Sequence, residues 1–134
     1  MKTTLPTLTL PHFLKPSLLK GHPWVYRDHI PKTFHAANGT WVQVKAGNWT
    51  GYALWDTTSP IALRIFSQRR QPDAKSIAQR VQAAWELRAI VREQQETTAY
   101  RCLFGEADGL PGLTVDLYGS YAVLVTYASS LDTI

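Results

Sequence analysis

The stretch GEADGLPGLTVDLYG, residues 105–119, carries three carboxylates, four glycines and one proline in fifteen positions. Asp108-Gly109 and Pro111-Gly112 are turn dipeptides, because glycine adopts backbone angles that other residues avoid. A carboxylate beside such a turn accepts hydrogen bonds from backbone N–H groups across the bend. Turn chemistry accounts for most of the stretch, and we interpret it first as a rigid structural turn.

Two chemical interpretations compete with the structural one. Glu106, Asp108 and Asp116 resemble a carboxylate set for acid–base work or for a hard cation. The spacing argues against a calcium loop of the EF-hand type, which needs oxygen donors at alternating positions and a glutamate at the twelfth. A magnesium site needs fewer protein ligands, so that alternative stays open.

A long helix is predicted upstream, from Ala74 to about Glu96, with Asp73 as its N-cap directly after a proline. Steps of 100° place its apolar residues on one stripe, made of Ile77, Val81, Ala84, Trp85, Leu87 and Val91. Arg88 falls in the middle of this stripe. A cation among apolar neighbours needs a partner, and we expect one of the carboxylates in residues 105–119.

Three strands should follow this helix, at 100–104, 113–118 and 121–127, with Gly119-Ser120 as a two-residue hairpin turn. Cys102 lies in the apolar run YRCLF, which indicates a buried small residue rather than a nucleophile. The second half is therefore expected to be a helix packed on a three-stranded antiparallel sheet. The final SSLDTI looks like the start of an element that nothing completes, so we expect the chain to be truncated.

The first half shows short strands and turns instead. Strands are predicted at 8–10, 41–45, 49–55 and 61–66, a short helix near 17–20, and turns at Asn38-Gly39 and Gly47-Asn48. Such a set is typical of a small, partly closed β-barrel. SQRRQPD, residues 67–73, is the expected linker, which gives domains at 1–70 and 71–134. With a β-barrel in the first domain and a helix on a sheet in the second, the expected fold class is α+β.

The distribution of charge also changes at the expected linker. Residues 1–72 hold nine Lys and Arg against two acids, a balance of +7, whereas residues 73–134 hold five against eight, a balance of −3. A basic part beside an acidic part indicates that only the first meets a polyanion.

The basic part also places cations among aromatic rings, the composition of a surface that holds phosphates and stacks on bases. The candidate RNA-binding residues are Lys15, Lys20, His22, Trp24, Arg27, Lys45, Arg64, Arg69 and Arg70. Trp24 also fits a barrel core, and we favour that interpretation for its ring. His22 and His29 lack metal-ligand spacing, so we expect no metal site.

Several function classes receive no support. The chain has no apolar run long enough for a membrane span, no secretory leader and one cysteine, which predicts a cytoplasmic protein that does not bind membranes. It lacks a glycine-rich dinucleotide loop, a phosphate loop and a nucleophile elbow. We therefore expect no cofactor and no catalytic residue in this chain.

Two segments resemble a known family. KPSLLKGHPWVY, residues 15–26, and YRCLFGEADGLPGLTVDLYGSY, residues 100–121, are similar to the N-terminal part of the PUA-containing, S-adenosylmethionine-dependent methyltransferases that make 5-methylcytosine in large-subunit rRNA. The matching positions of the second segment are Arg101, Glu106, Asp108, Gly109, Pro111, Gly112 and Asp116. Arg88 joins them as the expected structural partner.

The resemblance implies a PUA-like pseudobarrel that binds ribosomal RNA, a middle α+β domain, and a Rossmann-like methyltransferase domain absent from these residues. S-adenosylmethionine and the catalytic cysteine belong to that absent domain, so Cys102 does not inherit the role. The rival hypotheses are a stand-alone RNA-binding or assembly module and a small metal-dependent hydrolase using Glu106 and Asp108. A homodimer is left open, because an unpaired sheet edge can pair with a second copy.

Overall fold

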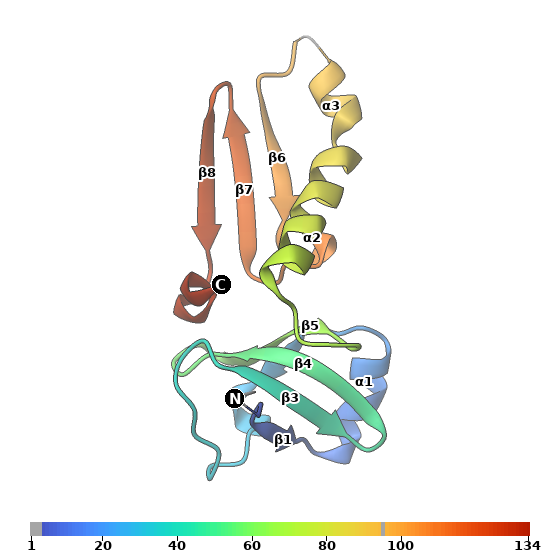
Figure 1. Cartoon of the computed structure of the whole chain (residues 1–134), viewed down its shortest axis with the longest axis vertical. Coiled ribbons are helices and arrows are strands. Elements are labelled where there is room, and N and C mark those ends of the chain that lie inside the picture. Colours follow the sequence, from blue (N-terminus) through green and yellow to red (C-terminus); the bar gives the residue numbers. More distant parts are fainter. Residues whose placement is uncertain (1–3, 95) are drawn as a thin grey trace. The chain divides into compact units, whose positions relative to one another are not determined.

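The computed structural model describes residues 4–94 and 96–134 and divides the chain into two compact units (Figure 1). Unit 1 comprises Met1–Pro72 together with Ala128–Ile134, and unit 2 comprises Asp73–Tyr127. The predicted second domain extends to residue 134, whereas the structure assigns the last seven residues to unit 1. Within the described residues, no helix is long and apolar enough to cross a membrane.

Unit 1 is built on a five-stranded sheet in the order β1-β3-β4-β5-β2. The strands are β1 (Thr7–Thr9), β2 (Trp24–Tyr26), β3 (Trp41–Ala46), β4 (Trp49–Trp55) and β5 (Ile61–Ser67). β1 pairs in parallel with β3, and the other pairs are antiparallel. The four predicted strands are present, but β2 was not predicted as a strand because only three residues follow Pro23 before the chain turns again.

Short helical turns connect these strands. They are η1 (His12–Leu14), α1 (Lys15–Leu19), η2 (Arg27–His29) and, at the end of the chain, η4 (Ser129–Thr133). The helix predicted near 17–20 therefore begins two residues earlier, where Pro16 occupies its first turn.

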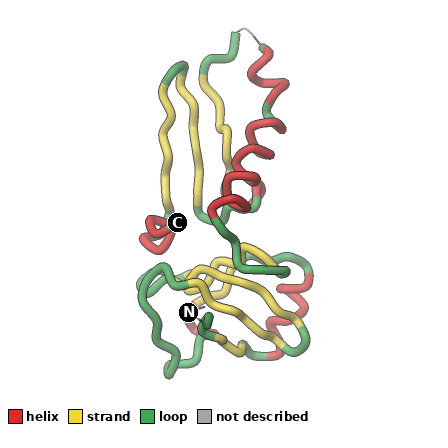
Figure 2. The backbone as a smooth tube through the Cα atoms, in the orientation of Figure 1, coloured by secondary structure: helices red, strands yellow, loops and turns green. Residues whose placement is uncertain are grey.

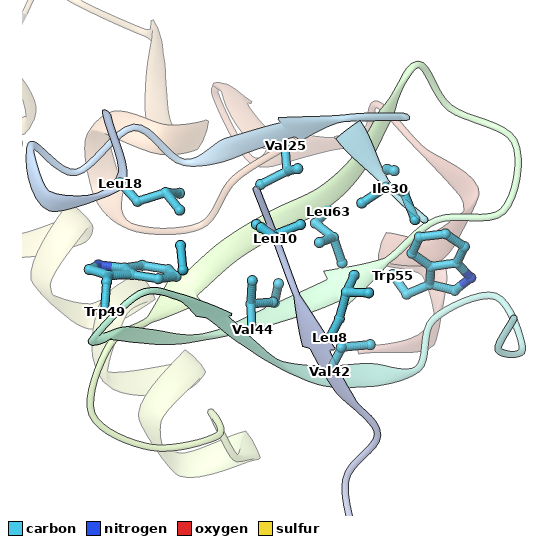
Figure 3. Packing of buried hydrophobic residues seen from close by; sticks show 13 residues of the cluster. Leu8, Leu10, Leu18, Val25, Ile30, Val42, Val44, Trp49, Trp55 and Leu63 are labelled. Atoms are coloured by element: carbon cyan, nitrogen blue, oxygen red, sulfur yellow. The ribbon is translucent and has the colours of Figure 1, made fainter. Parts of the chain in front are cut away.

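The core of unit 1 lies on one face of the sheet. Val42 and Val44 alternate with more exposed neighbours along β3, as a half-buried strand requires. Trp49 and Leu18 lie at one end of the cluster, and Trp55 and Ile30 at the other (Figure 3).

Unit 2 has the predicted α+β arrangement, a helical segment beside a three-stranded antiparallel sheet (Figure 2). The sheet order is β6-β7-β8, with bounds β6 (Ala99–Phe104), β7 (Leu113–Tyr118) and β8 (Tyr121–Thr126). The turn η3 (Gly105–Asp108) joins β6 to β7. The fold class predicted from the sequence is confirmed.

The single helix predicted over residues 74–96 is wrong in one respect. It is divided into α2 (Ala74–Leu87) and α3 (Ala89–Glu93), with Arg88 between them at φ −93° and ψ 13°. The predicted N-cap is confirmed, because the Asp73 side chain accepts the Ser76 backbone N–H and the Ser76 hydroxyl accepts the Asp73 N–H. Of the predicted stripe only Ala84 is buried, and Leu87 is 74% exposed, since the three-stranded sheet covers only part of the stripe.

Candidate RNA interface

The strand register of unit 1 gathers most of the predicted RNA-binding residues at one end of the sheet. Ala46 pairs with Trp49 across the β3–β4 turn, and Tyr52 pairs with Ser67, so the C-terminal end of β5 lies beside that turn. Ile65 donates its N–H to the Pro23 carbonyl at 2.7 Å, which brings the start of β2 to the same end. We call this the basic end; its members are Lys15, Lys20, His22, Lys45, Arg69 and Arg70.

The β3–β4 turn and the start of α1 are in close contact at the basic end. Gly47 has φ +60°, and a Cβ added there would lie 2.9 Å from the His12 ring and 3.2 Å from the Lys15 side chain. Only glycine satisfies both the turn and this approach. Lys15 and Lys45 are therefore carried by neighbouring parts of one surface, although they are thirty positions apart in sequence.

His22, Pro23 and Trp24 form a compact local turn. The Trp24 N–H donates to His22 Nδ1 at 3.2 Å, and the two rings meet edge to face with their centroids 6.0 Å apart. His22 is exposed and Trp24 is half-buried, so the Trp24 ring is neither a full core residue nor a fully exposed platform.

Two predicted RNA-binding residues do not belong to the basic end. Arg64 is only 4% exposed, so its side chain belongs to the interior and not to a phosphate-binding surface. Arg27 lies just after β2, away from the basic end, and its guanidinium donates to the Ser59 carbonyl at 2.6 Å and the Asp56 carbonyl at 2.5 Å. In the sequence, a buried arginine of a strand cannot be distinguished from an exposed one by its charge. Charge alone therefore did not separate Arg27 and Arg64 from the residues of the basic end.

The acidic turn of unit 2 is tied to the helix as predicted. Arg88 makes a two-pronged ion pair with Asp108, with N–O distances of 2.7 and 2.8 Å, and Asp108 also accepts the Phe104 N–H. The hydrogen bond from Arg88 is the main reason that the pKa of Asp108 lies below its usual range, and it raises the pKa of Arg88 in turn. Both groups stay charged at neutral pH, which suits a structural tie rather than an acid–base catalyst.

The other motif residues are also engaged in structure. Arg101 pairs with Asp116 across β6 and β7 at 2.7 Å, and Glu106 accepts the Gly112 N–H at 3.2 Å across the turn. Gly109 and Gly112 have φ values of +73° and +80°, which explains both glycines. Cys102 is buried as predicted, and burial raises the pKa of its thiol. Over residues 4–94 and 96–134, no three potential metal ligands cluster.

Sequence reasoning missed Asp56, which organises the end of unit 1 opposite the basic end. This carboxylate is fully buried and accepts the N–H groups of Thr58, Ser59 and Ser130. Burial alone would raise its pKa, but hydrogen bonds from Ser59, Ser130 and Thr58 outweigh burial and lower the pKa to about 2. The only sequence signal was DTTSP, which is typical of an ordinary turn.

The comparison of this chain with protein families agrees with the β architecture of unit 1. A family model described as "PUA-like domain" matches residues 8–68, which include strands β2 to β5 and all of β1 except Thr7. Residues 8–68 are therefore similar to a PUA-like domain. The basic end therefore belongs to this PUA-like domain and to the residues that directly follow it.

Two curated relatives extend the similarity beyond the PUA-like domain. The chain is 34% identical over 113 residues to Ribosomal RNA large subunit methyltransferase I of Erwinia tasmaniensis, covering 81% of this chain and 28% of that protein. It is 31% identical over 124 residues to the protein of the same name from Klebsiella pneumoniae, covering 89% of this chain and 31% of that protein. The chain thus spans less than a third of the length of these relatives.

Two solved structures share the fold. A structure described as "a putative methyltransferase complexed with SAH" superimposes with a TM-score of 0.85 at 19% identity, over 96% of this chain and 34% of that one. A second structure, described as "a putative sam-dependent methyltransferase from Streptococcus mutans", gives a TM-score of 0.84 at 18% identity, over 96% of this chain and 35% of that one. At this identity the likeness concerns the fold alone. The matched residues come from both units.

Proposed function

We propose that this chain is the RNA-binding portion of an rRNA (cytosine-5) methyltransferase that acts in the cytoplasm. The PUA-like domain binds ribosomal RNA through the basic end, and unit 2 connects it to a catalytic domain that these residues do not contain. The observation that carries the proposal is the convergence of five Lys and Arg side chains from α1, β3 and the segment after β5 on one end of a PUA-like sheet.

Charge supports a division of labour between the two units. Phosphate contacts need exposed cations, and the balance of +7 is confined to residues 1–72. Two arginines of unit 2 are already paired, because Arg88 and Arg101 each bind an aspartate of the same unit. Unit 2 therefore has little to offer a polyanion and serves as a connector.

Methyl transfer is proposed to reside outside this chain. S-adenosylmethionine would bind the domain that makes up the remaining length of the relatives, and that domain would also supply the nucleophile. Cys102 suits no such role, since its thiol is buried and burial raises its pKa. The chain alone should transfer no methyl group from S-adenosylmethionine to rRNA.

The basic end can be tested by salt-dependent RNA binding. Arg69→Gln with Arg70→Gln should weaken binding to an rRNA fragment and lower the slope of log K against log salt by roughly 0.7 to 0.9 for each phosphate that is no longer neutralised. Lys75→Gln serves as the control, because it removes one exposed cation in α2 of unit 2. Fluorescence anisotropy at several salt concentrations gives both quantities. An unchanged slope in the double variant would remove these arginines from the interface.

A further inference from the structure

A hollow opens in unit 1 at the end of the sheet opposite the basic end. Its volume is about 410 Å³, and its lining includes Arg27, Lys32, Phe34, His35, Trp55 and Thr57. Volumes of a few hundred cubic ångströms are typical of sites for small organic ligands. Residues 30–36, in the segment between η2 and β3, form much of its wall.

The aromatic part of this hollow is held in place before any ligand arrives. Trp55 lies at one end of the core (Figure 3), and its indole Nε1–H donates to the Ala36 carbonyl at 3.1 Å. The Phe34 ring meets it edge to face, with the centroids 4.9 Å apart. Phe34 is only half-buried, so part of its ring is available to a ligand.

The polar part is fixed as well. The Arg27 guanidinium lies 5.3 Å from the centre of the Trp55 ring and is held by the carbonyls of Asp56 and Ser59. Among the ion pairs of the described residues, none involves Arg27. Its positive charge therefore stays directed by backbone carbonyls, with no side-chain carboxylate to neutralise it.

We infer that this hollow binds one unstacked nucleobase of single-stranded RNA. This inference rests on the proposed function and names the part of the RNA that the second end of the sheet recognises. An aromatic wall with cations beside it suits a base and its neighbouring phosphate, because any base stacks on an aromatic ring while Arg and Lys hold the backbone. Asp28 also lines the hollow; it repels a bare phosphate but accepts the N–H groups of a base edge.

The two ends of the sheet lie within reach of one RNA strand. The seven residues of β4 span about 20 Å at the usual rise per residue, and they join the basic end to Trp55. Phosphates at the basic end would position the strand, and the hollow would select a base that is free of pairing. The positive balance of residues 1–72 favours an anionic ligand, and the aromatic lining of the hollow favours a nucleobase over the side chains of an acidic peptide.

The Trp55 indole N–H gives a specific NMR probe of the hollow. In ¹H–¹⁵N spectra of the whole chain, Trp55→Phe identifies its signal among those of five tryptophans. Titration with the four nucleoside 5′-monophosphates should move this signal, whereas ribose 5-phosphate, which has no base, should leave it in place. The signal of Trp85 in α2 of unit 2, identified by Trp85→Phe, is the internal control. An equal shift with ribose 5-phosphate, or no shift with any nucleotide, overturns the inference.

A matched pair of variants tests the hollow with RNA. Phe34→Leu keeps an apolar side chain against Trp55 but removes the stacking surface, and should weaken binding of an unstructured eight-nucleotide RNA about tenfold. Phe13→Leu makes the same change at a residue of η1 that does not line the hollow and should have no effect. Equal affinity in the two variants contradicts the inference.

The outcomes also separate the inference from the proposed function. If RNA binding depends on Arg69 and Arg70 while nucleotides leave the Trp55 signal unmoved, the proposed function stands and the base site is overturned. If nucleotides move the Trp55 signal but the chain ignores rRNA, the base site stands and the proposed function fails. If neither is observed, both are overturned.

Discussion

At the scale of single residues, the ion pair of Arg88 and Asp108 shows what a charge on an apolar stripe signifies. The Arg88 side chain is 18% exposed and that of Asp108 is 5% exposed, so each group has given up much of its water and depends on the other. The sequence predicted this pair because an arginine among apolar residues such as Trp85 and Val91 loses water and needs a charged partner in its place. The sequence could not identify which of three carboxylates is the partner, since that depends on the direction of the turn after β6.

Removal of Arg88 should therefore be costly. Arg88→Ala leaves the largely buried Asp108 carboxylate without its ion-pair partner, which should destabilise the protein by about 2 kcal/mol and lower the thermal midpoint by about 5 °C or more. Circular dichroism during heating measures the midpoint. Arg101→Ala is the matched control, since it breaks the exposed pair with Asp116 and should change the midpoint little. Equal effects of the two substitutions would show that burial does not distinguish the pairs.

At the scale of elements, the periodicity of apolar residues predicted where the strands lie better than it predicted which of their side chains are buried. The pattern of Trp41 to Trp55 predicted two strands and a glycine turn, all of which are present. The residues of β8 are apolar and were expected in a sheet, yet Tyr121 is 76% exposed and Leu124 is 65% exposed. Alternation indicates that a residue fits a strand, whereas burial depends on which elements lie over the sheet.

The hairpin of β3 and β4 contains a close approach that composition did not reveal. A Cβ at Gly51 would lie 2.3 Å from the Trp49 ring, so Gly51→Ala must displace this core tryptophan. We expect a decrease of about 1–3 kcal/mol in the free energy of unfolding, measured by urea denaturation. In a Trp49→Leu background the added methyl group meets no ring, so the same substitution should cost little there. A full cost in both backgrounds would mean that the Trp49 ring is not the cause.

At the scale of the whole molecule, the last residues of the chain return to its first unit. The Ser130 N–H donates to Asp56 at 3.2 Å, and Asn38 donates to the Ser129 hydroxyl at 3.0 Å. Asp56 and Ser130 are 74 positions apart, and no local pattern relates them. Sequence reasoning predicted the two-part organisation from charge and the linker, but it could not assign this terminal segment.

Protonation of Asp56 at low pH should weaken the hydrogen bonds that this carboxylate accepts, including the one from Ser130. The pKa of Asp56 is about 2 in the folded protein against 3.8 for an ordinary aspartate, so its contribution to stability is complete above about pH 5 and disappears as the pH falls from there through 2. The shift corresponds to about 2 kcal/mol. The difference in the free energy of unfolding between wild type and Asp56→Asn should therefore be largest near neutral pH and should decrease in acid. Urea unfolding at pH 7, 4 and 2.5 measures it, and a constant gap would contradict the assignment.

The return of Ala128–Ile134 makes the first unit discontinuous in sequence, with unit 2 as an insertion between its two segments. A fragment ending at Pro72 would keep the five strands but would expose Asp56 where Ser130 now covers it. Joining Pro72 to Ala128 through a short flexible linker would preserve both segments and excise the insertion. Such a shortened polypeptide is the minimal form in which nucleic-acid recognition can be studied without the acidic unit.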